Sequence, residues 1–220
     1  MPVSVLEREM YTEAAAARLL GVAQNTLNYW LEGGQRRGRR YRPIIRVEPK
    51  GARAGVTWGE FIEAGLLRQY RARNVPMAEL RTFIDKIRER YGVPYPLADR
   101  RPYVLGRELI TEAQDDARLD PEFCLVAVVR DQYVLTAVAE AFMQRVDWEG
   151  DEPARWRPHV DPASPVRMDP AVRFGMPAIG GVRTEMIWEH SEAGETDDEI
   201  AAEFDLPVGS VRWALAYEAG

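Results

Sequence analysis

The chain has 220 residues and a net charge of −6, and with 46% hydrophobic and 29% charged residues its composition is typical of a folded globular protein. Its single cysteine, Cys124, excludes an intramolecular disulfide and a cysteine-based zinc site. The first ten residues lack the basic start and apolar core of a signal peptide, and the longest apolar run, CLVAVV, is too short to span a bilayer. We therefore expect a cytoplasmic protein that has no membrane partner.

Charge is distributed unevenly along the chain. Residues 1–90 hold 17 Lys or Arg against 10 Asp or Glu, which gives +7, whereas residues 91–220 hold 12 against 25, which gives −13. A basic N-terminal part beside an acidic remainder predicts separate tasks, with nucleic acid as the partner of the first part and a different partner for the second.

Two short helices joined at Gly21 are predicted from the stretch Thr12 to Trp30, TEAAAARLLGVAQNTLNYW. Apolar residues at helical spacing form one face of the first helix, and glycine readily adopts the left-handed conformation that ends it. The second helix turns Leu27 inward and leaves polar side chains outward, where they can hydrogen-bond base edges and phosphates in a major groove. The pattern favours a helix-turn-helix, and an ordinary helical hairpin is the alternative. The candidate DNA contacts of the second helix are Gln24, Asn25, Thr26, Asn28 and Tyr29.

A run of basic residues follows the second helix. Eight Lys or Arg lie within residues 36–53, opposed only by Glu48, and YRPIIRV, PKGARAG and VTW are interleaved with them. This pattern predicts two short strands around a Gly-rich tip, which is the form of a basic wing. Each cation that neutralises a phosphate releases a counterion, so the run favours DNA contact that weakens with salt, although a solvated charged face is the alternative. The arginines assigned to this contact are Arg36, Arg37, Arg39, Arg40, Arg42 and Arg46.

The stretch YTEAAAARLLGVAQNTLNYW resembles the opening of MerR-type winged helix-turn-helix domains. The later stretch TWGEFIEAGLLRQYRARNVPMAELRTFIDKI is similar to the helices that follow the wing in that family, and the likeness covers about residues 10–91. The wing of this chain is longer and richer in arginine than the usual family wing, so individual base contacts do not carry over. The resemblance implies a DNA-binding domain over residues 1–92.

Two further helices are predicted before residue 92. A capping box formed by Thr57 and Glu60 begins the first, which runs to about Arg73, and Asn74 begins the second, with Pro76 in its first turn. The second helix carries an apolar stripe that we expect either in the core or across a dimer axis. The residues of the stripe are Leu80, Phe83, Ile84 and Ile87.

A proline-rich joint at residues 92–102 marks the first domain boundary. Beyond it, residues 103–111 and 123–129 are predicted as strands that an acidic turn region separates. A helix from Thr136 and a final hairpin with residues 149–153 at its tip complete a small α+β unit over residues 100–160. This middle unit shows no catalytic constellation, and dimerisation of the chain is one role open to it.

The last predicted domain, residues 166–220, is a trihelical, helix-turn-helix-like unit. Thr184 begins its first helix, which ends at Gly194, Thr196 with Glu199 forms a capping box for the second, and Ser210 is a candidate cap for the third. Acidic side chains on these helices repel phosphates, so the unit predicts protein contact rather than DNA contact. The expected fold class is therefore mainly α, with a small α+β middle unit.

The C-terminal pattern D-P-x(4)-G-x-P-x-I-x-G-x-R, followed by A-G-E-T-x-x-E-I-A and A-x-x-Y, resembles the small domain of antitoxins whose partners are PIN-like toxins. Val182 stands where this domain usually has Thr. Together with the N-terminal domain, the arrangement resembles VapB-type antitoxins. The matching residues are Asp169, Pro170, Gly175, Pro177, Ile179, Gly181, Arg183, Gly194, Glu199, Ile200, Ala201, Ala214 and Tyr217.

The resemblance implies a homodimer whose N-terminal domain binds operator DNA and represses its own operon, while its C-terminal domain blocks a PIN-like ribonuclease toxin. Such nucleases hold Mg²⁺ with carboxylates, so an inserted Arg183 is physically sensible. A local pair of Arg183 with Glu185 or with an Asp of the last helices is the alternative. The aromatic candidates are either interface anchors or core residues. The candidate toxin-binding residues are Arg173, Phe174, Pro177, Arg183, Trp188, Arg212, Trp213 and Tyr217.

Neither catalytic residues nor a cofactor is predicted. The chain has only His159 and His190 beside one cysteine, and it has no P-loop or GxGxxG motif, so we expect a protein that is not an enzyme and holds no metal. A second hypothesis is a MerR-like regulator whose middle unit senses a small molecule. That hypothesis requires a ligand pocket but no protein partner.

Overall fold

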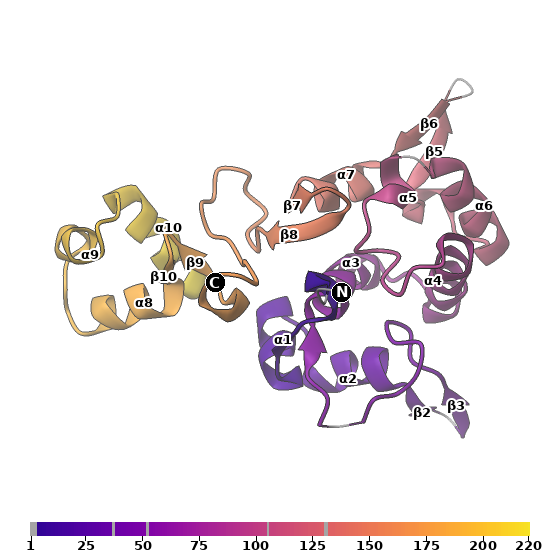
Figure 1. The fold of residues 1–220 in the computed structure, drawn as a ribbon, viewed down its shortest axis with the longest axis horizontal. Coiled ribbons are helices and arrows are strands. Elements are labelled where there is room, and N and C mark those ends of the chain that lie inside the picture. The colour runs from indigo at the N-terminus through magenta and orange to yellow at the C-terminus, as the bar shows by residue number, and fades with distance from the viewer. Residues whose placement is uncertain (1–3, 37, 52, 105, 130–131) are drawn as a thin grey trace. The chain divides into compact units, whose positions relative to one another are not determined.

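The computed structural model describes residues 4–36, 38–51, 53–104, 106–129 and 132–220, and Figure 1 shows its fold. About half of the chain is helical and the sheets of the described residues are two-stranded, so the class is mixed α/β rather than mainly α. The chain divides into two compact units: unit 1 is Met1–Met143 with Trp148–Pro153, and unit 2 is Gln144–Asp147 with Ala154–Gly220. None of the described helices combines the length and the apolar character that crossing a bilayer requires.

Unit 1 combines helices with small antiparallel sheets, in which β1 pairs with β4, β2 with β3 and β5 with β6. The hairpin β7–β8 follows, and only its tip, residues 148–153, belongs to unit 1. The elements in chain order are η1 (Val5–Glu7), β1 (Glu9–Tyr11), α1 (Glu13–Leu20), α2 (Gln24–Glu32), β2 (Gly34–Arg36), β3 (Arg39–Tyr41), β4 (Val56–Thr57), α3 (Trp58–Ala72), α4 (Met77–Tyr91), α5 (Arg101–Val104), α6 (Arg107–Ala117), η2 (Pro121–Phe123), β5 (Val126–Val129), β6 (Gln132–Leu135), α7 (Ala137–Met143), β7 (Val146–Glu149) and β8 (Glu152–Trp156).

Helices α1 and α2 lie on either side of Gly21, over the residues for which helices were predicted. The Thr12 hydroxyl accepts a hydrogen bond from the Ala15 amide at 3.2 Å and so caps the start of α1. Gly21 ends α1 with a φ of +61°, a left-handed conformation that glycine adopts without steric cost. Leu20 of α1 and Leu27 of α2 are almost completely buried, so their apolar faces fix the two helices together.

Of the two wing strands predicted, the one at residues 56–58 is present as β4, but it does not pair as a wing strand, and the one at residues 41–47 is wrong. The hairpin forms earlier in the chain, between β2 and β3, and β4 pairs instead with β1. Ile44 and Ile45 are fully buried, and both of their amides donate to the Trp30 carbonyl, at 2.9 and 3.0 Å. Pro43, Ile44 and Ile45 therefore belong to a buried loop that packs against the end of α2, whereas Val47 is exposed.

Helix α3 is the central helix of unit 1. It begins with the predicted capping box, in which the Thr57 hydroxyl accepts from the Glu60 amide at 3.3 Å and the Glu60 carboxylate accepts from the Thr57 amide at 3.0 Å. Every residue from Trp58 to Leu67 is buried, because other elements cover α3 on all sides. Two of these buried residues, Glu60 and Glu63, are acidic.

The apolar stripe of α4 lies in the core of unit 1, where α4 packs against α6. No residue of the stripe is more than 1% exposed, so this face is filled within unit 1 and is not available for a dimer axis. Its members are Leu80, Phe83, Ile84 and Ile87.

The strand predicted at residues 103–111 is wrong, because α5 and α6 cover this region. Ile110, Ala113, Gln114 and Ala117 are buried at helical spacing, and the acidic residues between them lie on the exposed face of α6. The Gln114 carboxamide oxygen accepts hydrogen bonds from the backbone amides of Leu125, at 2.7 Å, and Val126, at 3.0 Å. The buried oxygen of this side chain therefore has hydrogen-bond partners.

Unit 2 is built around a core cluster of apolar residues from β9, α8, α9 and α10, among them Ile187, Ile200 and Val211. The Thr196–Glu199 capping box is present at the start of α9. Ser210 does not cap α10, which follows Pro207 and has no side-chain cap. Besides its share of the β7–β8 hairpin, the elements of unit 2 are η3 (Arg173–Gly175), β9 (Ala178–Ile179), β10 (Val182–Arg183), α8 (Thr184–Glu192), α9 (Asp197–Phe204) and α10 (Val208–Glu218).

Candidate nucleic-acid interface and partner-binding surface

The first turn of α2 presents Gln24 and Asn25, both of which are exposed. The residue before the helix, Ala23, provides no side-chain cap for the amides of this turn. Backbone amides without a cap at a helix N-terminus carry partial positive charge, and they can donate hydrogen bonds to an anion such as a phosphate. This end of α2 therefore offers both amide side chains and backbone donors to a nucleic acid.

The other α2 candidates are held more firmly by the protein. The side-chain amide of Asn28 donates to the Glu13 carboxylate of α1 at 2.9 Å, so this side chain is held against α1. Thr26 and Tyr29 are half-buried. Sequence reasoning missed Glu13 as a partner because it lies on the neighbouring helix, 15 residues away.

The β2–β3 hairpin carries the exposed arginines Arg39 and Arg40. The guanidinium carbon of Arg39 lies 5.9 Å from the centre of the Tyr41 ring, and Tyr41 in turn meets Tyr29 of α2 edge-on, with 6.4 Å between ring centres. These contacts join the hairpin to α2, so the arginines and the outward side of α2 belong to one surface. Tyr41 was not predicted, although its place within the basic run was a usable signal.

The remaining arginines of the run have different environments. The Arg42 side chain is 76% exposed and pairs with Asp85 of α4 at 3.1 Å. An exposed ion pair of this kind contributes little, so a phosphate can replace Asp85 at small cost. Arg36 ends β2, and Arg37 lies outside the described residues.

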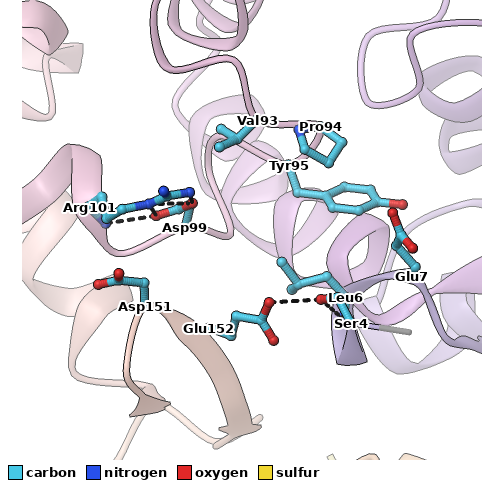
Figure 2. A pocket seen from close by; sticks show the side chains of 10 residues that line it. All are labelled: Ser4, Leu6, Glu7, Val93, Pro94, Tyr95, Asp99, Arg101, Asp151 and Glu152. Carbon is cyan, nitrogen blue, oxygen red and sulfur yellow. Dashed lines mark hydrogen bonds and ion pairs between the residues drawn. The ribbon is translucent and has the colours of Figure 1, made fainter. Parts of the chain in front are cut away.

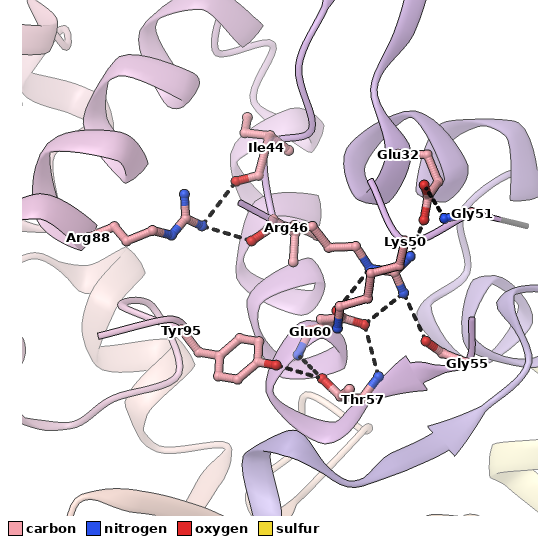
Figure 3. Close-up of polar contacts among 11 residues, drawn as sticks. Glu32, Ile44, Arg46, Lys50, Gly51, Gly55, Thr57, Glu60, Arg88 and Tyr95 are labelled. Carbon is pink, nitrogen blue, oxygen red and sulfur yellow. Dashed lines mark hydrogen bonds and ion pairs between the residues drawn. The ribbon is translucent and has the colours of Figure 1, made fainter. Parts of the chain in front are cut away.

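Arg46, which we predicted to contact DNA, instead lies inside unit 1 with its side chain 2% exposed. Figure 3 shows the residues that it contacts. It donates to both carboxylate oxygens of Glu60, at 2.9 and 3.0 Å, to the Gly55 carbonyl at 2.8 Å, and to Glu32. Burial lowers the pKa of Arg46, but its bonds to Glu60 and Glu32 outweigh burial and raise the pKa. Arg46 therefore ties a loop to α2 and α3 and is not part of the exposed basic surface.

The ion pair with Arg46 also shifts the pKa of Glu60. Burial raises the pKa of Glu60, but hydrogen bonds from Arg46, Lys50 and the Thr57 amide outweigh burial and lower the pKa. The Lys50 ammonium lies 2.9 Å from the Glu60 carboxylate (Figure 3). Two of the eight cations of the basic run are thus occupied with one buried carboxylate.

In unit 2, a turn with left-handed backbone presents Phe174. The φ angles of Arg173, Phe174 and Gly175 are +49°, +57° and +70°, and this conformation costs about 1–2 kcal/mol for each residue other than glycine. The Phe174 side chain is 70% exposed, while the Arg173 guanidinium donates to the Gly181 carbonyl at 2.6 Å and so fixes the turn to the β9–β10 hairpin. Strain that holds an aromatic ring in solvent suggests a binding role.

Arg183, at the end of β10, is half-buried and forms no ion pair with any described residue. The local pair with Glu185 that we considered is therefore absent from the described chain. Arg212 differs, since its side chain is 70% exposed and pairs with Asp197 at 2.9 Å. Of the two, Arg183 has the guanidinium that is free to meet a carboxylate of another molecule.

The other candidates of unit 2 lie closer to its core. Pro177 is buried, and Trp213 and Tyr217 are partly buried against the core cluster. Trp213 also meets His159 edge-on, with 5.4 Å between ring centres. Trp188 is half-buried. These side chains pack within unit 2. The exposed candidates are those of the η3 turn and Arg212, whereas Arg183 is half-buried but unpaired among the described residues.

A cavity of about 500 Å³ in unit 1 was not predicted, because its lining comes from three distant segments (Figure 2). Within the cavity the Arg101 guanidinium donates to the Asp99 carboxylate, with one contact of 3.0 Å. Glu7, Asp151 and Glu152 add further carboxylates to the lining. The cavity is therefore acidic, and it suits a small cationic compound better than a phosphate.

Comparison with known proteins matches residues 166–217 to a family described as "Protein of unknown function (DUF433)". "Uncharacterized protein Rv2308" of Mycobacterium tuberculosis is 32% identical over 223 residues, covering 97% of this chain and 92% of that protein. "Putative antitoxin VapB45" of the same organism is 28% identical over 222 residues, covering 94% and 92%. The crystal structure of Rv2018, also from this organism, has the same fold, with a TM-score of 0.74 at 24% identity over 96% of this chain and 99% of that one.

Proposed function

We propose that this chain, which belongs to the same family as the Rv2308 protein, is the antitoxin of a type II toxin–antitoxin system. The observation that carries the proposal is the similarity to "Putative antitoxin VapB45", which extends over 94% of the chain and therefore includes both units. In this proposal unit 2 binds and neutralises a PIN-like ribonuclease, and unit 1 binds operator DNA.

The DNA half of the proposal rests on the surface shared by α2 and the β2–β3 hairpin. Arg39, Arg40 and Arg42 are exposed in and just after the hairpin, which contacts α2 through Tyr29, and the uncapped first turn of the same helix exposes Gln24 and Asn25. Arginines of this kind supply affinity for the phosphate backbone, and side-chain amides supply base contacts. Acting as a homodimer, the chain would occupy two operator half-sites and repress its own operon.

The toxin half of the proposal rests on Phe174 and Arg183. An exposed aromatic side chain on a fixed turn is the type of anchor that dominates binding energy in protein interfaces. A PIN-like ribonuclease collects carboxylates around its Mg²⁺ ions, and the unpaired guanidinium of Arg183 is complementary to such a cluster. Arg173, which holds the turn, has a supporting role.

The proposal predicts that a PIN-like protein is encoded beside this gene, and co-expression of the two proteins followed by affinity pull-down tests it. We expect the full chain to retain the toxin, and Phe174→Ala and Arg183→Ala each to weaken retention and restore ribonuclease activity. Val160→Ala is the matched control, because Val160 is an exposed hydrophobic residue of the same unit, 76% exposed. The proposal fails if the full chain retains no toxin, and the surface is wrong if all three variants bind as the wild type does.

A ligand-responsive regulator is the second candidate function, and the acidic cavity of unit 1 favours it. Its volume lies in the range of known small-molecule sites. This candidate predicts operator affinity that changes with a small cationic metabolite in the absence of any protein partner, and a loss of that response in Asp151→Asn.

A further inference from the structure

His190, Glu195 and Glu203 gather where α8 meets α9, and none of them was a candidate of either surface. His190 lies in the last turn of α8 and Glu203 in the last turn of α9, and Glu195 lies in the connecting turn, where its amide donates to the His190 carbonyl at 3.2 Å. The His190 Nδ1 atom is 3.0 Å from both Glu195 carboxylate oxygens and 3.6 Å from Glu203 Oε2. One ligand atom from each residue lies within 4.8 Å of the others.

The charges of this cluster do not balance. Two carboxylates face one imidazole, and no lysine or arginine of the described chain forms an ion pair with Glu195 or Glu203. The negative charge of a third carboxylate, Glu189, also acts on His190. The cluster therefore carries net negative charge even when the imidazole is protonated, and it attracts a cation.

The separations of the ligand atoms suit a metal ion. A divalent ion about 2.1 Å from an imidazole nitrogen and a carboxylate oxygen, with about 90–110° between them, separates the two atoms by about 3.0–3.4 Å. The His190 Nδ1 atom is 3.0 Å from Glu195, inside this range, and 3.6 Å from Glu203, just above it, and the three ligand atoms all lie within 4.8 Å of one another. Rotation of the partly exposed carboxylates toward a shared ion would close the remaining gap. Phe204 meets the His190 ring edge-on at 4.9 Å between centres, which supports its orientation.

We propose that His190, Glu195 and Glu203 bind a divalent first-row transition-metal ion such as Zn²⁺. An imidazole with two carboxylates is a donor set for these metals, whereas Mg²⁺ and Ca²⁺ take oxygen ligands. Water completes the coordination, since the His190 and Glu203 side chains are 27% and 52% exposed. The bound ion joins the end of α8 to the end of α9 and stabilises unit 2.

Isothermal titration of the chelator-treated full chain with ZnCl₂ at pH 7.5 tests the site. We expect one ion bound per chain, and binding at least about tenfold weaker in His190→Gln and in Glu203→Gln. Glu192→Gln is the control, because Glu192 is an exposed glutamate at the end of the same helix and does not belong to the cluster. Zn²⁺ should raise the melting temperature of the wild type and the control, but not of the other two variants.

The absence of binding heat in the wild type, or equal affinities in all four proteins, would overturn the proposal. Circular dichroism checks that each variant folds, which is expected because both substituted side chains are partly exposed. Imidazole resonances give an independent readout, since the chain has only two histidines. Zn²⁺ should shift the His190 resonances, and a response confined to His159 would contradict the assignment.

Discussion

The same capping box occurs in both units, at the start of α3 and at the start of α9, but its surroundings differ. In each box the glutamate accepts from the threonine amide, at 3.0 Å for Glu60 with Thr57 and at 2.8 Å for Glu199 with Thr196. Glu60 is fully buried and also binds Arg46, whereas Glu199 is exposed and serves only as a cap. The motif thus predicts where a helix begins, while packing decides how much stability depends on it.

The two units also use charge differently. Unit 1 buries Arg46, Glu60 and Glu63 around its central helix, whereas the core cluster of α8, α9 and α10 is apolar. Buried ion pairs are costly to break because the remaining partner stays desolvated, and exposed charges are not. Substitutions of charged residues in the interior of unit 1 should therefore affect folding, and those on either surface should affect binding.

The largest effect is expected from Glu60→Ala. The substitution leaves the Arg46 guanidinium buried with only Glu32 as a charged partner, which should cost about 3–5 kcal/mol of unfolding free energy. Glu199→Ala, the matched change in the other capping box, should cost clearly less, because Glu199 is exposed and has no cationic partner in the described chain. Urea denaturation of both variants measures the difference, and equal losses would contradict the comparison.

The second prediction concerns the pH dependence of stability through Glu63. Burial raises the pKa of Glu63 to about 8, and its Oε1 accepts from the Leu97 amide at 2.9 Å while its Oε2 has no partner. Between pH 4.5, the usual value, and pH 8 the folded state keeps a proton that the unfolded chain loses. Stability should therefore fall by about 1.4 kcal/mol per pH unit in this window and level off above it.

Glu63→Gln should remove this slope, because a neutral amide still accepts from Leu97 and does not titrate. Unfolding free energies of the wild type and the variant between pH 5 and pH 9 measure the effect. Glu108→Gln is the control, since Glu108 is exposed on α6 and its removal should leave the slope unchanged. A wild-type profile as flat as that of Glu63→Gln would show that Glu63 titrates normally.

Sequence patterns located the elements whose signals are local. Gly21 and the two capping boxes lie within a few residues of the bonds they form, so the helix ends they mark were predicted. Arg46 was misassigned because its partners, Glu32 and Glu60, each lie 14 residues away, and a run of arginines does not tell which member turns inward.

Other errors have equally specific causes. Residues 103–111 alternate weakly in hydrophobicity and were taken for a strand, although the helical spacing continues through the acidic residues that follow. The left-handed backbone at Phe174 had no sequence signal, because residues other than glycine rarely adopt it and tertiary contacts impose it. The acidic cavity was missed since it depends on how distant segments pack.

The third prediction concerns the exposed arginines of the β2–β3 hairpin, which differ from the buried Arg46 in being able to contact DNA. Arg39→Ala combined with Arg40→Ala should lower the salt slope of operator binding by about 2, since each phosphate contact contributes about 0.9. Unfolding free energy should change little, because both side chains are exposed. Fluorescence anisotropy with DNA from upstream of the gene, at several salt concentrations, measures the slope. Arg212→Ala, an exposed arginine of unit 2, should leave it unchanged, and an unaltered slope in the double variant would exclude the hairpin from the interface.

The smallest effect on stability is expected from the titration of His190. Nearby carboxylates raise the pKa of His190, whereas burial raises the pKa of Glu63. The hydrogen bond with Glu195, and then the charges of Glu195 and Glu203, raise the pKa of His190 above its usual 6.5. The resulting stabilisation is complete below pH 6.5 and is lost as the pH rises through the folded-state pKa. An NMR titration in chelator-treated buffer should show this raised pKa, and Glu195→Gln should bring it back toward 6.5.

Salt distinguishes the two titrations, because it screens exposed charges and does not reach buried groups. Adding NaCl should therefore lower the pKa of His190. It should leave the pH dependence of stability that comes from Glu63 unchanged, because burial is the largest cause of the raised pKa of Glu63. Glu192→Gln is the control for His190, as it removes an exposed charge of α8 that forms no contact with the ring. Burial lowers the pKa of an imidazole, so desolvation cannot produce a raised value. A raised His190 pKa that resists both salt and Glu195→Gln would therefore contradict its assignment to the exposed carboxylates.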